Sequence, residues 1–164
     1  MGADPIVFVR SAVPADIEVL AALERIARDV MRDQRGGRRR LEECPAVGDR
    51  WGSWIAETDR AVVVAGLDEA VFAWLSIRAP DIDGVAVIDS VYVEEGAREL
   101  GLGDDLVSWA LAWARDRQAT SVESWALPGD RETKNLFERN GLTARLITVS
   151  RSLSGPATEV DASR

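Results

Sequence analysis

Histidine is absent from this chain of 164 residues, and cysteine occurs once, at Cys44. Without histidine, Ser-His-Asp and Cys-His nucleophiles are excluded, as are zinc and iron sites built on imidazole ligands. Any general base must therefore be a carboxylate, or a water molecule held by one. The single cysteine excludes an intramolecular disulfide and favours a reducing, cytoplasmic compartment. With no histidine to activate it, we expect Cys44 to be an unreactive core thiol.

Long apolar runs and a surplus of basic residues are also missing. No run approaches the ~18 apolar residues that a membrane span needs, and Met1–Pro5 lacks the layout of a signal peptide. The formal net charge of −8 disfavours nucleic-acid binding, which needs a basic face, and suits a small cationic substrate. With 46% hydrophobic and 29% charged residues, the composition is that of one globular domain with a substantial core.

The first half of the chain predicts one strand and two helices. A strand is expected over 7–9, and a helix with a wide apolar stripe starts at Pro14 and ends before Gly36. The basic run 38–40 is interpreted as a solvated turn, with phosphate binding or nuclear localisation as the alternative. A second helical segment covers 50–57.

The second half predicts three consecutive strands and then alternating helices and strands. We expect a single domain over 1–153, with no internal repeat or linker, and a frayed polar tail over 154–164. The elements are strands over 61–65, 71–78 and 85–93, a helix over 101–118, a strand over 121–126, a helix over 129–139 stopped by a glycine, and a last strand over 142–149.

One segment carries the clearest chemical signal: Arg98-x-x-Gly101-x-Gly103, which follows a β-branched run ending at Val93 and opens a helix. Glycines allow close approach of the backbone to a ligand, and the N–H groups at a helix N-terminus, helped by the helix dipole, can seat a pyrophosphate. Alternatively, the glycines serve only packing and capping. The first glycine of a dinucleotide fingerprint is missing, and no Gly-Lys-Ser/Thr of a P-loop follows.

This segment resembles the acyl-CoA signature of the GNAT N-acetyltransferase superfamily, R/Q-x-x-G-x-G/A, which also places a valine five residues before the arginine. The element order β-α-α-β-β-β-α-β-α-β is similar to that superfamily over roughly residues 6–153. The resemblance implies an α/β (α+β) fold with a mixed, largely antiparallel sheet flanked by helices, and acetyl-CoA as cofactor. Cofactor contacts are then expected from Val91, Tyr92, Val93, Arg98, Glu99, Leu100, Gly101, Leu102 and Gly103.

A second segment resembles the late helix of the same superfamily, Asn-x-x-Ala-x-x-Leu-Tyr-x-x-x-Gly-Phe. Leu136 and the following glycine match, whereas Asp130 replaces the Asn and Phe137 replaces the Tyr. The resemblance implies that Asp130 and Phe137 contact the cofactor. In relatives the tyrosine hydroxyl is thought to protonate the departing thiolate, and phenylalanine has no proton to give. We therefore expect Phe137→Tyr to preserve or raise turnover; Tyr92, the only tyrosine, either replaces that hydroxyl or packs as a core aromatic.

Amide formation from a thioester needs a neutral amine, although alkyl amines with a pKa near ~10.4 are protonated at neutral pH. It also needs donors for the oxyanion and alignment of the two reactants. The resemblance implies that strand 85–93 splays from its neighbour near Val91–Val93, so that the pantetheine arm pairs with it as another strand.

Asp89 is the first candidate for the general base and Glu123 the second; an ordinary ion pair is the alternative for Asp89. Strand periodicity places Val87, Asp89, Val91 and Val93 on one face, and Ile88, Ser90 and Tyr92 on the other.

The sequence therefore predicts an N-acetyltransferase that moves acetyl from acetyl-CoA directly to a primary amine of a small molecule or peptide, without a covalent intermediate or a metal. The alternative is a non-catalytic module that binds acyl-CoA. Two carboxylates, Asp104 and Asp105, follow the glycine turn closely and would repel phosphates, so Arg98 must offset them. The resemblance also implies that the last strand can mediate a homodimer. The acceptor amine itself is not specified.

Overall fold

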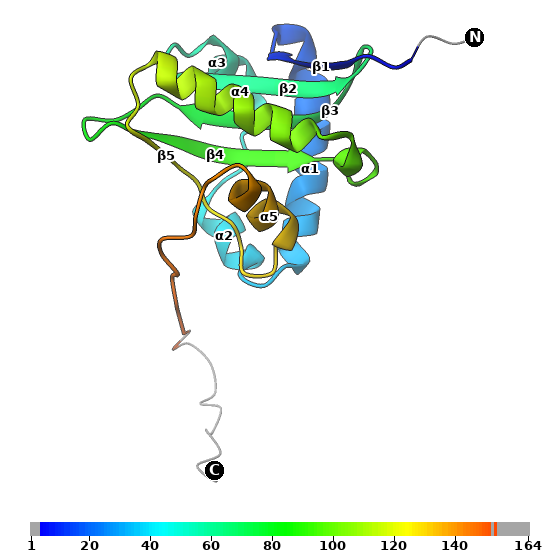
Figure 1. Cartoon of the computed structure of the whole chain (residues 1–164). Helices are drawn as coiled ribbons and strands as arrows, with labels where there is room; N and C mark the ends of the chain where they lie inside the picture. Colours follow the sequence, from blue (N-terminus) through cyan, green and yellow to red (C-terminus); the bar gives the residue numbers. More distant parts are fainter. Residues whose placement is uncertain (1–3, 152, 154–164) are drawn as a thin grey trace.

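A five-stranded mixed sheet forms the centre of the computed structural model, which describes residues 4–151 and 153. The spatial order is the order in the chain, and β1 to β4 pair antiparallel, whereas β5 runs parallel to β4 (Figure 1). This confirms the predicted largely antiparallel sheet. The strands are β1 (Val7–Ser11), β2 (Arg60–Leu67), β3 (Ala70–Arg78), β4 (Val85–Val93) and β5 (Ser121–Glu123).

Helices cover both faces of this sheet. Figure 1 shows α4 across one face and α1 behind the other, with α2 and α5 beyond the β4 edge. Three 3₁₀ turns, η1 (Pro14–Asp16), η2 (Gly48–Arg50) and η3 (Glu95–Leu100), precede helices. The helices are α1 (Ile17–Asp33), α2 (Gly37–Glu43), α3 (Trp51–Ala56), α4 (Leu102–Asp116) and α5 (Arg131–Arg139).

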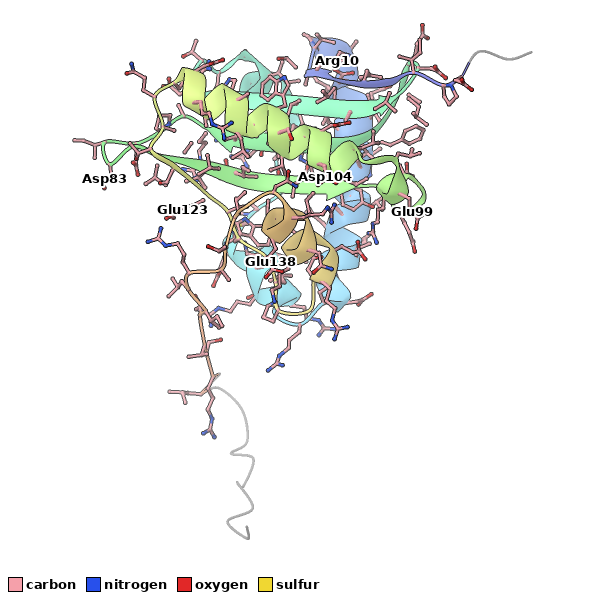
Figure 2. All side chains as sticks on the ribbon, viewed as in Figure 1. Arg10, Asp83, Glu99, Asp104, Glu123 and Glu138 are labelled. Carbon is pink, nitrogen blue, oxygen red and sulfur yellow. The ribbon has the colours of Figure 1, made fainter. Side chains whose placement is uncertain are left out.

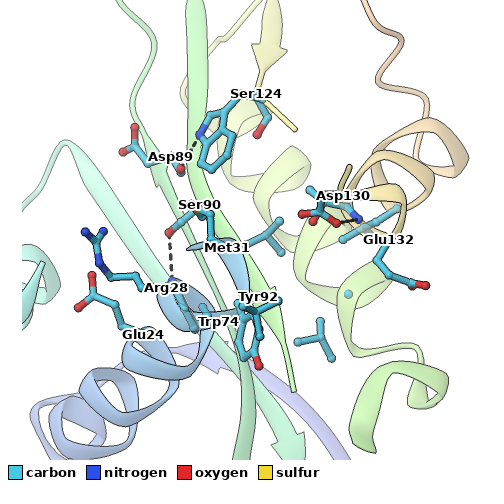
Figure 3. A pocket seen from close by; sticks show the side chains of 18 of the residues that line it. Glu24, Arg28, Met31, Trp74, Asp89, Ser90, Tyr92, Ser124, Asp130 and Glu132 are labelled. Carbon is cyan, nitrogen blue, oxygen red and sulfur yellow. Dashed lines mark hydrogen bonds between the residues drawn. The ribbon is translucent and has the colours of Figure 1, made fainter. Parts of the chain in front are cut away.

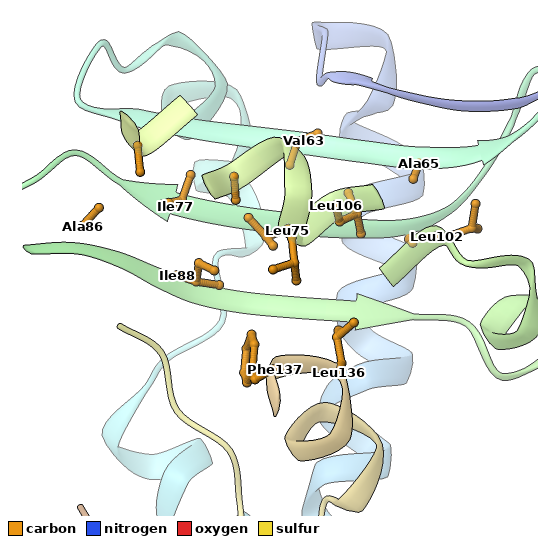
Figure 4. Packing of buried hydrophobic residues seen from close by; sticks show 14 of the residues in the cluster. Val63, Ala65, Leu75, Ile77, Ala86, Ile88, Leu102, Leu106, Leu136 and Phe137 are labelled. Atoms are coloured by element: carbon orange, nitrogen blue, oxygen red, sulfur yellow. The ribbon is translucent and has the colours of Figure 1, made fainter. Parts of the chain in front are cut away.

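Alternation along the strands divides the buried residues between two cores. Val63 and Leu75 belong to the core under α4 and α5, together with Ile77 and Ile88 (Figure 4). Their neighbours Val62, Val64 and Trp74 point to the opposite face, where Leu20, Leu23 and Trp51 from α1 and α3 complete the second core. Because both cores share the same strands, the sheet is held rigidly between two helical layers.

A β-bulge interrupts this alternation in β4. Ile88 pairs with Ile77 and Ser90 pairs with Ser76, so Asp89 has no partner in the β3–β4 register. The extra residue moves the following side chains to the other face. The predicted sharing of faces is therefore wrong beyond the bulge. Val91 and Val93 pack with Ile88 in the core under α4, whereas Tyr92 packs with the core under α1.

The C-terminal part of the sheet is smaller than expected. β5 covers three residues and not the predicted 121–126. The expected strand 142–149 is irregular, and Leu146 and Val149 are each 86% exposed. A last strand needs a neighbour, and a three-residue β5 offers little ladder to pair with. The predicted tail 154–164 lies outside the described residues, and the single domain over 1–153 stays a prediction.

The basic run 38–40 is also placed differently, because it belongs to α2 rather than to a turn. Arg28 on α1 donates to two carbonyls of the last turn of this helix, at Cys44 O (2.9 Å) and Leu41 O (3.4 Å). A cation at a helix C-terminus is favourable for the helix dipole. This tertiary contact is invisible in the local sequence, which shows only glycines followed by charge.

Candidate active site

The site begins where β5 leaves β4. The two strands pair only over Val85–Val87. The next two β4 carbonyls accept side-chain donors instead: Ser124 Oγ donates to Ile88 O (3.0 Å) and Trp125 Nε1 donates to Asp89 O (2.9 Å). From Ser90 to Val93, the edge of β4 opposite to β3 therefore pairs with no strand that the structure describes. This is the splay that the resemblance implied.

A cavity of about 420 Å³ lies along this open edge (Figure 3). Residues 89–93 of β4 form one wall, and residues of α1, α2, α3, α5, β2 and β3, with Gly103 at the start of α4, contribute to the others. We call the part beside Val93, Arg98 and Gly103 the turn end. The part lined by Arg28, Arg40, Arg60, Arg78 and Trp125 is the arginine end.

Gly101 shapes the turn end. Its φ of 77° and ψ of 3° lie in the left-handed region, which glycine adopts without a steric cost. It ends η3 and caps α4, whose first helical hydrogen bond runs from Asp105 N to Gly101 O. The N–H groups before Asp105 in this first turn have no intrahelical acceptor. A Cβ at Gly101 would meet no described atom within 4 Å, so the space beside these donors is open to an anion.

Gly103 has a packing role in addition. A Cβ there would lie 3.1 Å from Leu136 Cδ1. The glycine therefore lets α5 approach the start of α4, and both Gly103 and Leu136 line the cavity. Gly103 therefore packs and Gly101 caps α4, as the alternative of packing and capping held, and the open space beside Gly101 leaves room for a ligand as well.

Asp104 is neutralised by a partner that the sequence analysis missed. Arg139 on α5 contacts its carboxylate at 2.9 and 3.0 Å, and Asn140 Nδ2 donates to it at 2.7 Å. The hydrogen bond from Arg139 holds the pKa of Asp104 below its usual value. Arg98, whose Nε donates weakly to Val93 O at 3.4 Å, therefore does not have to offset Asp104 alone.

The two candidate bases lie in different surroundings. Asp89 lines the cavity, is 23% exposed, and contacts Arg60 at 2.6 Å and Arg78 at 2.9 Å. Glu123 is 49% exposed, pairs with Arg145 at 2.8 Å, and is not among the described residues that line the cavity. Figure 2 shows Glu123 toward the end of β4 opposite to Glu99. Asp89 thus forms the ion pair that was the alternative to its role as base, and it also lies in the cavity where a base would be needed.

The remaining predicted cofactor residues divide by side-chain placement. Asp130 lines the cavity and accepts a hydrogen bond from Thr133 N (3.0 Å), so it caps α5. Val91 and Tyr92 line it as well, whereas Glu99 and Leu100 lie on exposed η3. Leu102 was expected to contact the cofactor. Its side chain is fully buried, so only its backbone can face a ligand.

Phe137 is a second correction. Its side chain is 7% exposed, packs in the core under α4 and α5, and is not among the described residues that line the cavity (Figure 4). Phe137 therefore does not occupy the cofactor-facing position that the resemblance implied. The helical stripe of α5 explains this, because Leu136 and Phe137 are its apolar residues and bury together.

A small hydroxyl network, which the sequence did not indicate, lies on the α1 side of the open edge. Ser90 Oγ accepts from Trp74 Nε1 (3.1 Å) and lies 2.9 Å from Ser76 Oγ. Ser76 is fully buried, and Ser90 is its hydroxyl partner among the described residues. Either hydroxyl can donate to the other; if the buried Ser76 donates to Ser90, both buried donors, Trp74 Nε1 and Ser76 Oγ, are satisfied, and the hydrogen of Ser90 is left to point into the cavity. Burial raises the pKa of Tyr92 nearby, so it stays protonated at neutral pH.

The arginine end is the larger omission of the sequence analysis. Six arginines but four carboxylates line the cavity as a whole, although the chain carries a net charge of −8. The expectation that the acidic chain suits a cationic substrate is thus opposed by the cavity itself. Cys44, expected in the core, is half-buried and also lines the cavity.

The described residues contain neither a metal-binding group of side chains nor a membrane-spanning helix. Among residues 4–151, no group of His, Cys, Asp and Glu side chains has a metal-binding arrangement. Over the same part of the chain, no helix combines the length and apolar character needed to cross a membrane.

The sequence model of the Acetyltransferase (GNAT) family matches residues 20–142, and the chain belongs to this family. The resemblance inferred from the glycine turn is thereby confirmed. As a member, the protein is an acyl-CoA-dependent acyltransferase with acetyl-CoA as cosubstrate. A search of curated protein sequences found no match.

Solved structures show the same fold at low identity. A transcriptional regulator from Bacillus halodurans C-125 is 20% identical, with a TM-score of 0.69, 90% of this chain covered and 99% of that one. The aminoglycoside N-acetyltransferase AAC(6')-Iy in complex with CoA is 16% identical, with a TM-score of 0.64 and coverages of 92% and 98%. A ribosomal-protein-alanine N-acetyltransferase from Brucella melitensis biovar Abortus 2308 is 14% identical, with a TM-score of 0.63 and coverages of 90% and 99%.

Proposed function

We propose that the protein transfers acetyl from acetyl-CoA directly to a primary amine of a small molecule or peptide. The observation that carries this proposal is the open β4 edge at residues 90–93, which leads into the Gly101 turn. An extended ligand can pair with an open strand edge, and its anionic end then meets the first turn of α4. Acetyl-CoA has this form, with a pyrophosphate at one end of a pantetheine arm and the thioester at the other.

The two ends of the cavity are far enough apart for this arrangement. Asp89 and Val93 are four residues apart on β4, or about 13 Å at the usual rise of a strand. With the pyrophosphate at the turn end, the arm runs back along β4 toward Ser90 and Asp89. The acyl carbon then lies near the arginine end, where the acceptor enters.

The transfer makes one bond and breaks one. The amine nitrogen attacks the thioester carbonyl carbon, the new C–N bond forms, and the C–S bond breaks to release CoA as a thiolate. Asp89 is the proposed acceptor of the amine proton. Three arginine nitrogens make four contacts with its carboxylate, two to each oxygen, which matches the about four acceptor sites of an ionised carboxylate. Arg78 Nε is shared between both oxygens, so an amine N–H can take the place of one of its two contacts.

The departing thiolate does not require the missing tyrosine. A thiol such as that of cysteine has a pKa of ~8.5, well below that of an alkyl amine. Loss of the thiolate is therefore favoured over return of the amine, and solvent can protonate it. Ser90 lines the cavity, and when Ser76 donates to it, its own hydroxyl hydrogen can serve as a hydrogen-bond donor there.

Thiol release from acetyl-CoA, measured with a panel of primary amines, tests this function, with the mass of the N-acetylated product as confirmation. The melting temperature is measured in parallel with and without CoA. We expect a CoA-dependent rise together with amine-dependent thiol release. A CoA shift with no release for every amine would favour a module that binds acyl-CoA without catalysis. The absence of both responses would reject the assignment of this cavity.

A further inference from the structure

The guanidinium of Arg40 is fixed in place at the arginine end. It lies over the ring of Trp125, with Cζ 4.0 Å from the ring centroid, and Trp125 is itself held by its hydrogen bond to Asp89 O. The Arg40 Nε is buried, yet it has no hydrogen-bond partner among the residues that the structure describes. Because Nε is covered, the donors that Arg40 can offer to a ligand are those of its two terminal nitrogens, which also make no side-chain hydrogen bond to a described residue.

A second guanidinium shares this wall. Arg28 reaches from α1 and donates to the carbonyls of Cys44 and Leu41 on the α2 side. An arginine carries five N–H donors, so these two hydrogen bonds hold the Arg28 side chain and leave three of its donors for a ligand. Both arginines line the same cavity.

The carboxylates near these arginines are already engaged elsewhere. Glu24 is 7% exposed and accepts from Val47 N (2.7 Å), Gly48 N (3.0 Å) and Trp51 Nε1 (3.2 Å). Asp89 is occupied by Arg60 and Arg78. Figure 3 shows the other two lining carboxylates, Asp130 and Glu132, across the cavity on α5. The neutral donors leave the charge of Glu24 in place, but Glu24 and Asp89 are two carboxylates against the four arginines of the arginine end. Positive charge among the described lining residues of this end is therefore in excess.

The phosphates of CoA do not account for this excess. Their proposed seat is the turn end, about 13 Å along β4 from Asp89, where Arg98 and Arg139 lie with the first turn of α4. Arg28 and Arg40 come from α1 and α2, on the side where the acceptor would enter. A second anion, carried by the acceptor, is the ligand that this end can receive.

We propose that the acceptor carries a carboxylate close to its reacting amine, as an amino acid does, and that Arg40 and Arg28 bind this carboxylate. The inference rests on the proposed acetyl transfer in the same cavity. A planar guanidinium matches the two oxygens of a carboxylate, and stacking on Trp125 orients the plane of Arg40 in advance. A polycationic acceptor such as an aminoglycoside would meet like charge here, so this chain differs in acceptor from that structural neighbour.

Matched acceptors test the charge preference directly. We compare kcat/KM for L-leucine with that for L-leucinamide, in which only the carboxylate is replaced by a neutral amide, and add a polyamine as the cationic case. The carboxylate acceptor is expected to be preferred by about tenfold or more, the effect of a hydrogen bond to a charged group. The amide has the more acidic ammonium and is more often neutral, so its chemistry biases the comparison against the proposal.

Variants locate the effect. Arg40→Gln should reduce the ratio of the two kcat/KM values toward one, and Arg40→Lys should restore it only in part because lysine lacks the planar fork. Arg38→Gln is the matched control, since Arg38 lies on the same helix and is not among the described cavity-lining residues; the ratio should stay at the wild-type value. A merely structural role of Arg40 would lower both rates together and leave the ratio unchanged.

A binding measurement separates this inference from the function on which it rests. With CoA present, N-acetyl-L-leucine should raise the melting temperature of the protein more than N-acetyl-L-leucinamide does, and Arg40→Gln should remove that difference. Turnover with equal or greater preference for the amide or the polyamine would overturn the inference while the acetyltransferase assignment stands. Failure to bind CoA or to release thiol with any amine, despite Arg40-dependent binding of the free acid, would overturn only the acetyl transfer.

Discussion

The two ends of the cavity were encoded in opposite ways. At the turn end, Val93, Arg98, Gly101 and Gly103 are contiguous in the chain, and a strand, a 3₁₀ turn and a helix place them together. At the arginine end, the side chains come from α1, α2, β2 and β3, and from the segment after β5. The turn end was visible as a sequence pattern. The arginine end, which is proposed to select the acceptor, was not.

The turn end is held in place by the backbone, whereas the arginine end is held in place by side chains. The turn end depends on a glycine conformation and on helix N–H groups, which change little with the surrounding sequence. The arginine end depends on stacking, ion pairs and contacts to a helix terminus, each with a particular partner such as Trp125 or Asp89. Substitutions should therefore abolish function at the turn end and change specificity at the arginine end.

The largest effect is expected for Gly101→Val. A β-branched residue is strained at a φ of 77°, at a cost of roughly 1–2 kcal/mol, and its side chain would occupy the space beside the helix N–H groups. At a hundredfold excess over Kd, CoA should stabilise the wild type by about 2.7 kcal/mol. We expect that shift in melting temperature, and with it turnover, to disappear in the variant.

Gly96→Val is the matched control for this experiment. Gly96 lies in η3, and a Cβ there would also meet no described atom within 4 Å. Its CoA response should be close to that of the wild type. An unchanged CoA shift in Gly101→Val would show that the phosphates bind elsewhere.

Asp89→Asn is expected to lower kcat by about a hundredfold, the usual scale for loss of a general base. CoA affinity, measured by titration calorimetry, should change little because Asp89 lies away from the turn end. Glu123→Gln is the counterpart, and it should retain most of its activity because Glu123 is paired outside the cavity lining. Full activity in Asp89→Asn together with a large loss in Glu123→Gln would reverse the assignment.

Phe137→Tyr now has a different expected outcome from the one that the family motif suggested. In a closed core the new hydroxyl lacks a partner and costs roughly 1–3 kcal/mol. For a chain of this size that is a fall of about 3–10 °C in melting temperature, and we expect no gain in kcat. A rise in kcat with an unchanged melting temperature would instead mean that the ring edge reaches the sulfur.

A smaller effect is expected at the neutralised carboxylate of the turn end. Arg139→Ala leaves Asp104 without its main partner near the proposed phosphate seat, so Kd for CoA should rise by a few-fold, as for an exposed ion pair of about 1 kcal/mol or less. The control is Arg131→Ala, on the same helix but not among the described cavity-lining residues. Equal Kd values in the two variants would contradict a role for Arg139 beside the phosphates.

The same ion pair gives the smallest expected effect, a dependence of stability on pH. Arg139 lowers the pKa of Asp104 in the folded protein, so its contribution is present above the unfolded pKa of ~3.9 and is lost as pH falls through the folded value. The difference in melting temperature between the wild type and Arg139→Ala should be constant near neutral pH, should begin to shrink at about pH 4, and should vanish only below the lowered pKa of Asp104 in the folded protein. A difference that grows in acid would contradict this linkage.

Most of the secondary structure could be read from local patterns. Alternating apolar residues gave β2, β3 and β4, and helical spacing gave α1, α4 and α5, because these periodicities follow from backbone geometry. Two exceptions have a nonlocal cause. The helix α2 begins at Gly37, the second of two glycines, and is supported at its C-terminal end by Arg28. The segment 142–149 has strand-like residues, but the neighbouring strand β5 has only three residues and offers too short an edge for pairing.

The sequence by itself determined the family, the cosubstrate and the position of the Gly101 turn, where the phosphates are proposed to bind. A run of residues joined by peptide bonds keeps its spacing in any fold, and Gly101 needs only its own backbone freedom to form that turn. The tertiary structure alone decided that Asp89 is the bulge residue facing the cavity, that Phe137 is buried, and that Arg28 and Arg40 line one cavity, with Arg40 stacked on Trp125. Such outcomes depend on register, packing and charge pairing between segments far apart in the chain, which no local pattern specifies.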